Sequence, residues 1–185
     1  MALEGPLVAV AATRATCPTP SLEVLMPYPG FHLAQVNIAR AFGAMDDPVM
    51  AGFVAQLAAI NALADRSPGF VWRLQTEDGD ATAIRPYADD RILINLSVWE
   101  DLGPLQAFVF RSAHTSVMRR RREWFERFPE AYVALWWVTV GHRPSVEEAV
   151  ARLAHLQIHG PSSKAFTFRE AYDPWGRAAE PRARA

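Results

Sequence analysis

The sequence predicts an α+β domain of the ferredoxin-like type, in which an antiparallel sheet carries its two main helices on one face. Three observations favour this fold class. Strand-like and helix-like segments follow one another in the order β-α-β-β-α-β, a further helix and strand come after them, and the fourth strand is apolar on both faces. Because a strand of that kind is covered on both sides, we expect material on each face of the sheet.

Length and composition fit one domain of ordinary size. The chain has 185 residues, of which 50% are hydrophobic and 21% are charged, and a chain this long buries about 70% of its unfolded-state surface. The formal net charge of −1 argues against bulk binding to nucleic acid or to an anionic membrane, because both rely on many excess positive charges. The single cysteine, Cys17, excludes an intrachain disulfide and a cysteine-rich zinc site.

We expect a single domain over residues 30–170, preceded by a flexible arm at 1–29 and followed by a flexible tail at 171–185. Residues 1–25 are either a genuine arm or the product of a misplaced start codon, because Met26 stands just before the first strand. The short apolar stretch near the N-terminus has no basic region ahead of it, so it does not fit a secretory signal. No apolar run reaches the roughly 18 residues of a membrane span. These features predict a cytoplasmic protein.

The first half of the domain predicts a strand, a helix and a second strand. Alternating polarity indicates a strand over Phe31–Ala39. A helix begins at Asp47-Pro48, where the carboxylate can cap and proline occupies the first turn. That helix ends at Ser67-Pro68-Gly69, and a strand over Phe70–Gln75 follows. A long acidic connection with a turn at Asp78-Gly79 leads to the next strand.

A third strand and two helices come next. The strand covers Ile92–Trp99, with four aliphatic side chains on one face and a more polar set, including Asn95 and Trp99, on the other. The helices are expected over 103–111 and 113–128, with Ser112 as a cap between them.

The last part of the domain predicts a strand over Tyr132–Val140, a helix opened by the capping box of Ser145 and Glu148, and a short strand over Phe166–Phe168. We place the two main helices on one sheet face. The other face carries too many large apolar residues to be left in water, so we expect two sheets to pack together in a homodimer.

His114 is the best single candidate for chemistry. On its expected helix it shares a stripe with Met118 and Arg121 that faces the sheet. A neutral imidazole there could ligate a metal or act as a general base. The alternative is a hydrogen-bonded histidine that only stabilises the helix start. Arg121 could bind a carboxylate or propionate at the mouth of a pocket, or it is a solvated charge.

Aromatic and amide side chains complete the expected site. Tryptophans line sites for flat apolar ligands, and they also fill cores. A buried amide such as Asn37 must be satisfied, so it either orients a ligand or bonds to the backbone. We expect one pocket between the sheet and the paired helices. Its expected catalytic residues are His114, Asn37 and Trp99, and its expected substrate-binding residues are Arg121, Trp72, Met118 and Phe108.

Five segments of the sequence carry a family resemblance. They are HLAQVNIAR at 32–40, MAGFVAQLAAINALADRSPGFVWRLQ at 50–75, FVFRSAHTSVMRRRREWF at 108–125, LWWVTVGHRPSVEEAVARL at 135–153 and GPSSKAFTF at 160–168. These segments resemble the domain of unknown function 3291 family, which has no settled activity. The family is similar to the dimeric α/β-barrel superfamily, which implies a homodimer. That superfamily includes haem-degrading and haem-peroxidase enzymes, cofactor-independent monooxygenases and small binding or cyclising proteins.

A local likeness to the haem-degrading members lies in Trp99-Glu100 followed by Ala113-His114, with Asn37 at the place of their catalytic amide. The spacing here is shorter by about one helical turn. In those enzymes the corresponding histidine ligates iron, so the resemblance implies haem binding through His114.

Three functions remain open from the sequence. The first is a monooxygenase-like enzyme that uses no cofactor and acts on an electron-rich aromatic or apolar small molecule, because no nicotinamide or flavin fingerprint is present. The second is haem binding through His114. The third is a non-catalytic ligand-binding or assembly protein. A phosphate-binding glycine loop and a nucleophilic Gly-x-Ser-x-Gly turn are absent from the sequence.

Overall fold

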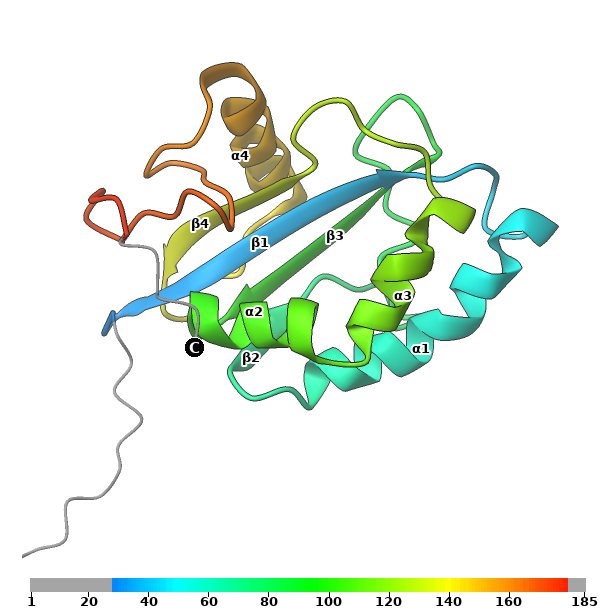
Figure 1. The fold of residues 1–185 in the computed structure, drawn as a ribbon, viewed down its shortest axis with the longest axis horizontal. Helices are drawn as coiled ribbons and strands as arrows, with labels where there is room; N and C mark the ends of the chain where they lie inside the picture. The colour runs from blue at the N-terminus through cyan, green and yellow to red at the C-terminus, as the bar shows by residue number, and fades with distance from the viewer. Residues whose placement is uncertain (1–27, 180–185) are drawn as a thin grey trace, which may run out of the picture.

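The structure is a computed structural model that describes residues 28–179. Its sheet has four antiparallel strands in the order β2-β3-β1-β4, which is the strand order of the ferredoxin-like fold (Figure 1). The predicted fold class is therefore confirmed. The strands are β1 (Phe31–Arg40), β2 (Phe70–Arg73), β3 (Ile92–Trp99) and β4 (Val133–Thr139).

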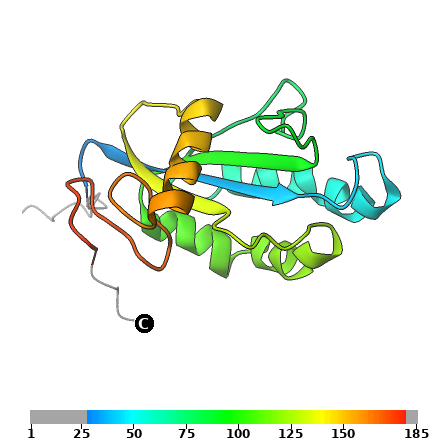
Figure 2. The same cartoon turned by 90° about the horizontal axis from the view of Figure 1, so that it is seen from above.

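The helices lie on both sides of the sheet, as the apolar fourth strand predicts. Three helices lie on one face and one on the other (Figure 2). Short 3-10 turns precede the first helix and follow the third. The first face carries α1 (Ala51–Asp65), α2 (Leu102–Arg111) and α3 (His114–Arg120), with η1 (Pro48–Met50) and η2 (Arg121–Glu123); the second carries α4 (Val146–His159).

The local signals for the ends of α1 and α4 act as expected. The Asp47 carboxylate accepts a hydrogen bond of 2.9 Å from the Val49 amide at the start of η1. The Ser145 hydroxyl accepts one of 3.1 Å from the Glu148 amide. Gly69 turns the chain after α1 with a φ of +73°, and a Cβ there would lie 2.6 Å from the Pro104 ring. This position therefore requires glycine both for its backbone angle and for the close approach.

The helix expected over 113–128 is shorter in the structure. It ends at Arg120, η2 continues it to Glu123, and the chain then extends. Trp124 and Phe125 turn into the core with exposed fractions of 2% and 9%, and Phe125 forms an isolated bridge with Ala41 beyond the end of β1. Continuing the helix would lose this burial, so tertiary packing decides where it stops.

The last expected strand, at 166–168, is reduced to a single bridge. Phe166 exchanges two backbone hydrogen bonds with Leu135 of β4, of 2.8 and 2.9 Å. The chain turns at Ser162 just before it and at Thr167 just after it. These turns limit the pairing with β4 to one residue pair.

The apolar sheet face opposite the three helices is covered within the single chain. Leu153 and Leu156 of α4 pack on it, and so do Ile84 and Tyr87 from the long connection between β2 and β3. Trp136, at the centre of this face, has no exposed surface. The sequence analysis expected a homodimer because it expected this apolar face to be uncovered in the single chain. The structure removes that reason, since the face is covered. The homodimer itself stays a prediction.

Residues 171–179 pack against the domain, which differs from the flexible tail expected to begin at residue 171. The Trp137 indole donates a 2.6 Å hydrogen bond to the Tyr172 carbonyl. The Asp173 carboxylate accepts hydrogen bonds from the Trp175 and Arg177 amides. The arm expected at 1–29, with the alternative start at Met26, lies outside the described residues except at its end.

One helical stretch of the described residues, Pro48–Asp65, is long and apolar enough to cross a membrane by length and composition alone. It consists of η1 and α1 of this domain. Two of its polar side chains, Gln56 and Asn61, face the cavity described below.

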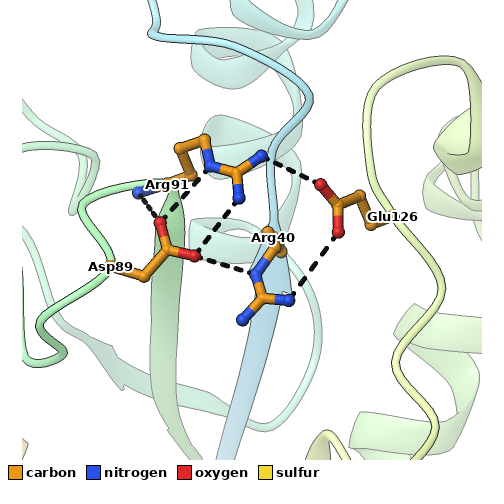
Figure 3. A network of polar contacts seen from close by, with 4 residues as sticks. All are labelled: Arg40, Asp89, Arg91 and Glu126. Atoms are coloured by element: carbon orange, nitrogen blue, oxygen red, sulfur yellow. Dashed lines mark hydrogen bonds and ion pairs between the residues drawn. The ribbon is translucent and has the colours of Figure 1, made fainter.

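A ring of four charged residues joins three segments at the far end of β1 (Figure 3). Arg40 lies 2.9 Å from Asp89 and 3.7 Å from Glu126, and Arg91 contacts the same two carboxylates at 3.4 and 2.9 Å. The Arg91 amide, by donating to Asp89, lowers the pKa of that carboxyl. The ring thereby fixes the segment after η2 against β1 and the start of β3.

We expect Leu153→Ala to lower the free energy of unfolding by about 2–5 kcal/mol, because it removes a buried side chain from the cover of the second sheet face. Leu153 is 1% exposed. Ile158→Ala is the matched control on the same helix, where the side chain is 74% exposed, and it should change stability by less than about 0.5 kcal/mol. Urea unfolding measures both, and equal losses would contradict this account of the face.

Candidate functional site

A cavity of ≈ 230 Å³ lies between the sheet and the three helices on its first face. Its floor comes from the polar faces of β1 and β3, and its roof from α1 and α3. The floor residues are Gln35, Asn37, Asn95, Ser97 and Trp99. The structure therefore places the polar strand face opposite the helix stripe of His114 and Arg121, as the sequence analysis expects.

The floor side chains form one continuous hydrogen-bonded chain. The Trp99 indole donates to the Ser97 hydroxyl at 3.0 Å, which donates to the Gln35 carbonyl oxygen at 3.0 Å. The Gln35 amide then donates to Asn37 Oδ1 at 3.0 Å. The same oxygen accepts a second hydrogen bond of 2.9 Å from the Asn95 amide.

The direction of this chain follows from chemistry, because an indole N–H can only donate. The Ser97 hydroxyl therefore accepts from Trp99, and its own proton points to the Gln35 carbonyl oxygen, which leaves the Gln35 amide nitrogen beside Asn37 Oδ1. Asn37 Oδ1 is occupied by two donors, and its Nδ2 makes no hydrogen bond to any residue within 28–179. Both N–H groups of Asn37 are therefore available to an oxygen atom of a ligand.

Four rings form a row along one wall of the cavity. Phe70 meets Trp99 edge to face at 5.3 Å between centroids, and Trp99 lies 5.1 Å from Phe108. Phe108 stacks on the His114 imidazole at 4.8 Å. This wall offers flat apolar surface beside a titratable group.

His114 is the first residue of α3, and Ser112 fixes it there. The Ser112 hydroxyl donates to the Phe108 carbonyl at 2.6 Å and accepts from the His114 amide at 3.1 Å, so it joins α2 to α3. Burial lowers the pKa of His114, and the nearby Val109 carbonyl offsets part of this decrease. His114 Nδ1 is buried and has no hydrogen-bond partner among residues 28–179. The side chain is thus a neutral imidazole at pH 7 with an unused nitrogen.

Arg121 lies at the end of the helix stripe, in η2, and lines the same cavity. Its guanidinium lies over the Tyr132 ring at 4.6 Å from the centroid. Arg73 also lines the cavity, but Asp65 holds it at 2.8 and 3.2 Å, and its third contact is the Gly79 carbonyl. The Asp80 carboxylate accepts from the amide and hydroxyl of Thr82.

A family model matches residues 32–182, which is most of the chain. The chain belongs to the family described as a domain of unknown function (DUF3291). The resemblance seen in its sequence segments is therefore confirmed. No curated protein matches the sequence.

Several solved structures are similar to this DUF3291 chain. SnoaB, a cofactor-independent oxygenase from Streptomyces nogalater, has 19% identity and a TM-score of 0.40, over 62% of this chain and 96% of that one. The ActVA-Orf6 monooxygenase of Streptomyces coelicolor, in complex with nanaomycin D, has 13% identity and a TM-score of 0.36, over 66% and 96%. A protein of unknown function from Nitrosomonas europaea has 13% identity and a TM-score of 0.40, over 63% and 95%.

The structure brings six of the seven expected site residues to the cavity and leaves one out. Trp72 packs in the core of the opposite sheet face. The register of β2 shifts between Phe70, which stays on the cavity side beside Trp99, and Trp72, which pairs with Val98. Such an irregularity moves the following side chain to the other face. The six that line the cavity are Asn37, Trp99, Phe108, His114, Met118 and Arg121.

Several cavity residues were not among the expected site residues. The sequence could have indicated Gln35 and Ser97, because strand alternation places them on the same faces of their strands as Asn37 and Trp99. Arg73 and Asn61 had no such signal in the sequence. Both donate to the Gly79 carbonyl, which lies in the long connection between β2 and β3, and the sequence pattern does not predict where that connection lies.

The residues present do not fit a haem. The cavity, at ≈ 230 Å³, is smaller than the roughly 300–1,000 Å³ of pockets for drug-sized ligands, and a porphyrin is large for that class. His114, the iron ligand that the resemblance implies, has its Nδ1 atom buried. Within residues 28–179, no three histidine, cysteine or acidic side chains form a group that could hold a metal ion.

We expect the free energy of unfolding to fall as the pH drops below about 6.5, the ordinary histidine value. The folded state holds the pKa of His114 below that value, so the unfolded chain binds the proton more readily and acid favours unfolding. His114→Gln should reduce this loss. Urea unfolding at pH 7.5 and pH 5 measures it, with Ile158→Ala, an exposed position that changes no titratable group, as the control. An unchanged pH dependence in His114→Gln would contradict the burial argument.

Proposed function

We propose that this protein binds a small, electron-rich aromatic molecule in the cavity and acts on it as a monooxygenase-like enzyme that uses no cofactor. The observation that carries the proposal is the placement of the neutral, half-buried His114 in a row of aromatic rings, facing a floor whose central amide still has free donors. A base, a flat apolar wall and an oxygen-binding group are the parts such a reaction needs.

The aromatic wall selects a flat apolar body, and the floor supplies its polar contact. A phenol or enol oxygen placed at Asn37 Nδ2 accepts hydrogen bonds that strengthen as the oxygen becomes negative. His114 takes the proton of that group, because an unprotonated imidazole can accept it at neutral pH. The resulting anion is the electron-rich form of the substrate.

The oxidant in this reaction is dioxygen. A phenol that becomes a para-quinone loses the hydrogen of its O–H bond and the hydrogen of its para C–H bond. One atom of dioxygen becomes the new carbonyl oxygen, and the other leaves as water with the two hydrogens. The substrate supplies both electron pairs, so no separate reductant is required.

Ligand binding without catalysis is the second candidate, and one observation favours it. No carboxylate orients the His114 imidazole among the described residues, whereas catalytic imidazoles are commonly held by such a group. In this function the same cavity holds the molecule, and the histidine only lines the wall.

We expect α-naphthol to bind and to be converted to its para-quinone with consumption of dioxygen. His114→Gln should keep α-naphthol binding within a few-fold and slow dioxygen uptake by about 10²–10⁴-fold, the usual contribution of a general base. Calorimetry measures binding, and an oxygen electrode with quinone absorbance measures turnover.

His159→Gln, at the exposed end of α4, is the matched control and should leave both quantities unchanged. Binding without any dioxygen uptake in the unsubstituted protein would favour the non-catalytic function. Absence of both would refute the proposal.

A further inference from the structure

The cavity has one positive charge that no carboxylate neutralises within the described residues. Arg121 is partly buried, lines the cavity and takes part in no ion pair there. The other cavity arginine, Arg73, is held by Asp65. Removing a charge from water is costly unless an opposite charge or hydrogen bonds compensate it.

The two acidic residues that follow Arg121 most closely in the chain are paired with other arginines. Glu123 pairs with Arg120 at 2.7 Å. Glu126 belongs to the ring of Figure 3, where Arg40 and Arg91 hold it. Neither of these two carboxylates is therefore paired with Arg121.

The Arg121 guanidinium is also held in a fixed place. It lies over the Tyr132 ring, at 4.6 Å from the centroid. Stacking on an aromatic face leaves the edge of the guanidinium free, and that edge presents paired N–H donors with the geometry of a carboxylate.

The separation of Arg121 from His114 sets the size of the ligand. The two positions are seven residues apart along α3 and the start of η2, which corresponds to about 10 Å at 1.5 Å per residue. A two-ring aromatic body beside Phe108 and His114, with a short aliphatic arm, spans this distance.

We propose that the substrate class is an aromatic carboxylic acid, whose rings lie against Trp99, Phe108 and His114 and whose carboxylate pairs with Arg121. This inference rests on the proposed function, because it concerns the same cavity. Beyond the proposed function, it assigns the ligand a negative charge and places that charge at the end of the cavity away from His114.

The test uses isothermal calorimetry to compare two probes with the same ring and arm, naphthylpropanoate, which ends in a carboxylate, and naphthylpropanol, which ends in an uncharged hydroxyl. The unsubstituted protein should bind the acid about tenfold to a hundredfold more tightly than the alcohol, the range expected for a charge-assisted pair. Arg121→Gln should bring the two affinities to within about twofold by weakening the acid only.

Two further variants control for general charge and for folding. Arg122→Gln removes an exposed positive charge from the neighbouring position and should keep the preference for the acid. Arg121→Lys retains the charge without the planar fork and should keep part of that preference. Unchanged binding of the alcohol by Arg121→Gln shows that its cavity is intact.

The outcomes separate the two proposals. If the unsubstituted protein binds neither probe, the proposed function fails, and this inference fails with it. If it binds both probes equally, or if Arg121→Gln and Arg122→Gln reduce the preference alike, the pairing with Arg121 is wrong while the small-molecule cavity stands.

Discussion

The hydrogen-bonded floor of β1 and β3 is the constraint on which the rest of the structure depends. Gln35 and Ser97 are each only 6% exposed, and a buried polar group left unsatisfied costs about 1–3 kcal/mol. The antiparallel register places Gln35 opposite Ser97 and Asn37 opposite Asn95, so these side chains satisfy one another. A slip of one residue would turn them into the apolar core of the other face.

The cavity follows from this floor. The helices pack closely only where the sheet offers apolar side chains, around Trp99 and Leu105 at one end and around Met50 and Trp124 at the other. Between these two clusters the floor is polar and internally bonded, and the helices do not close on it. His114 begins α3 near one cluster, and Arg121 follows it near the other.

Periodicity located much of the candidate site, because it depends only on near neighbours in sequence. Strand alternation placed Asn37 and Trp99 on one face, and helical spacing put Arg121 on the stripe of His114. The same rule failed at Trp72, where the irregular register of β2 interrupts the alternation. A bulge has no reliable signal in a four-residue strand, because it reflects how that strand fits its partner.

The sequence by itself determined the order of elements, the capping at Asp47 and Ser145, the two faces of each long strand and the family. The elements, caps and strand faces arise from contacts between residues close together in the sequence. The family is recognised from sequence segments alone, before any fold is known. Only the tertiary structure decided where α3 ends, that α4 covers the second sheet face, and that Glu126 is held away from Arg121. Each of these depends on side chains that are distant in sequence and meet only when the sheet and its helices have packed.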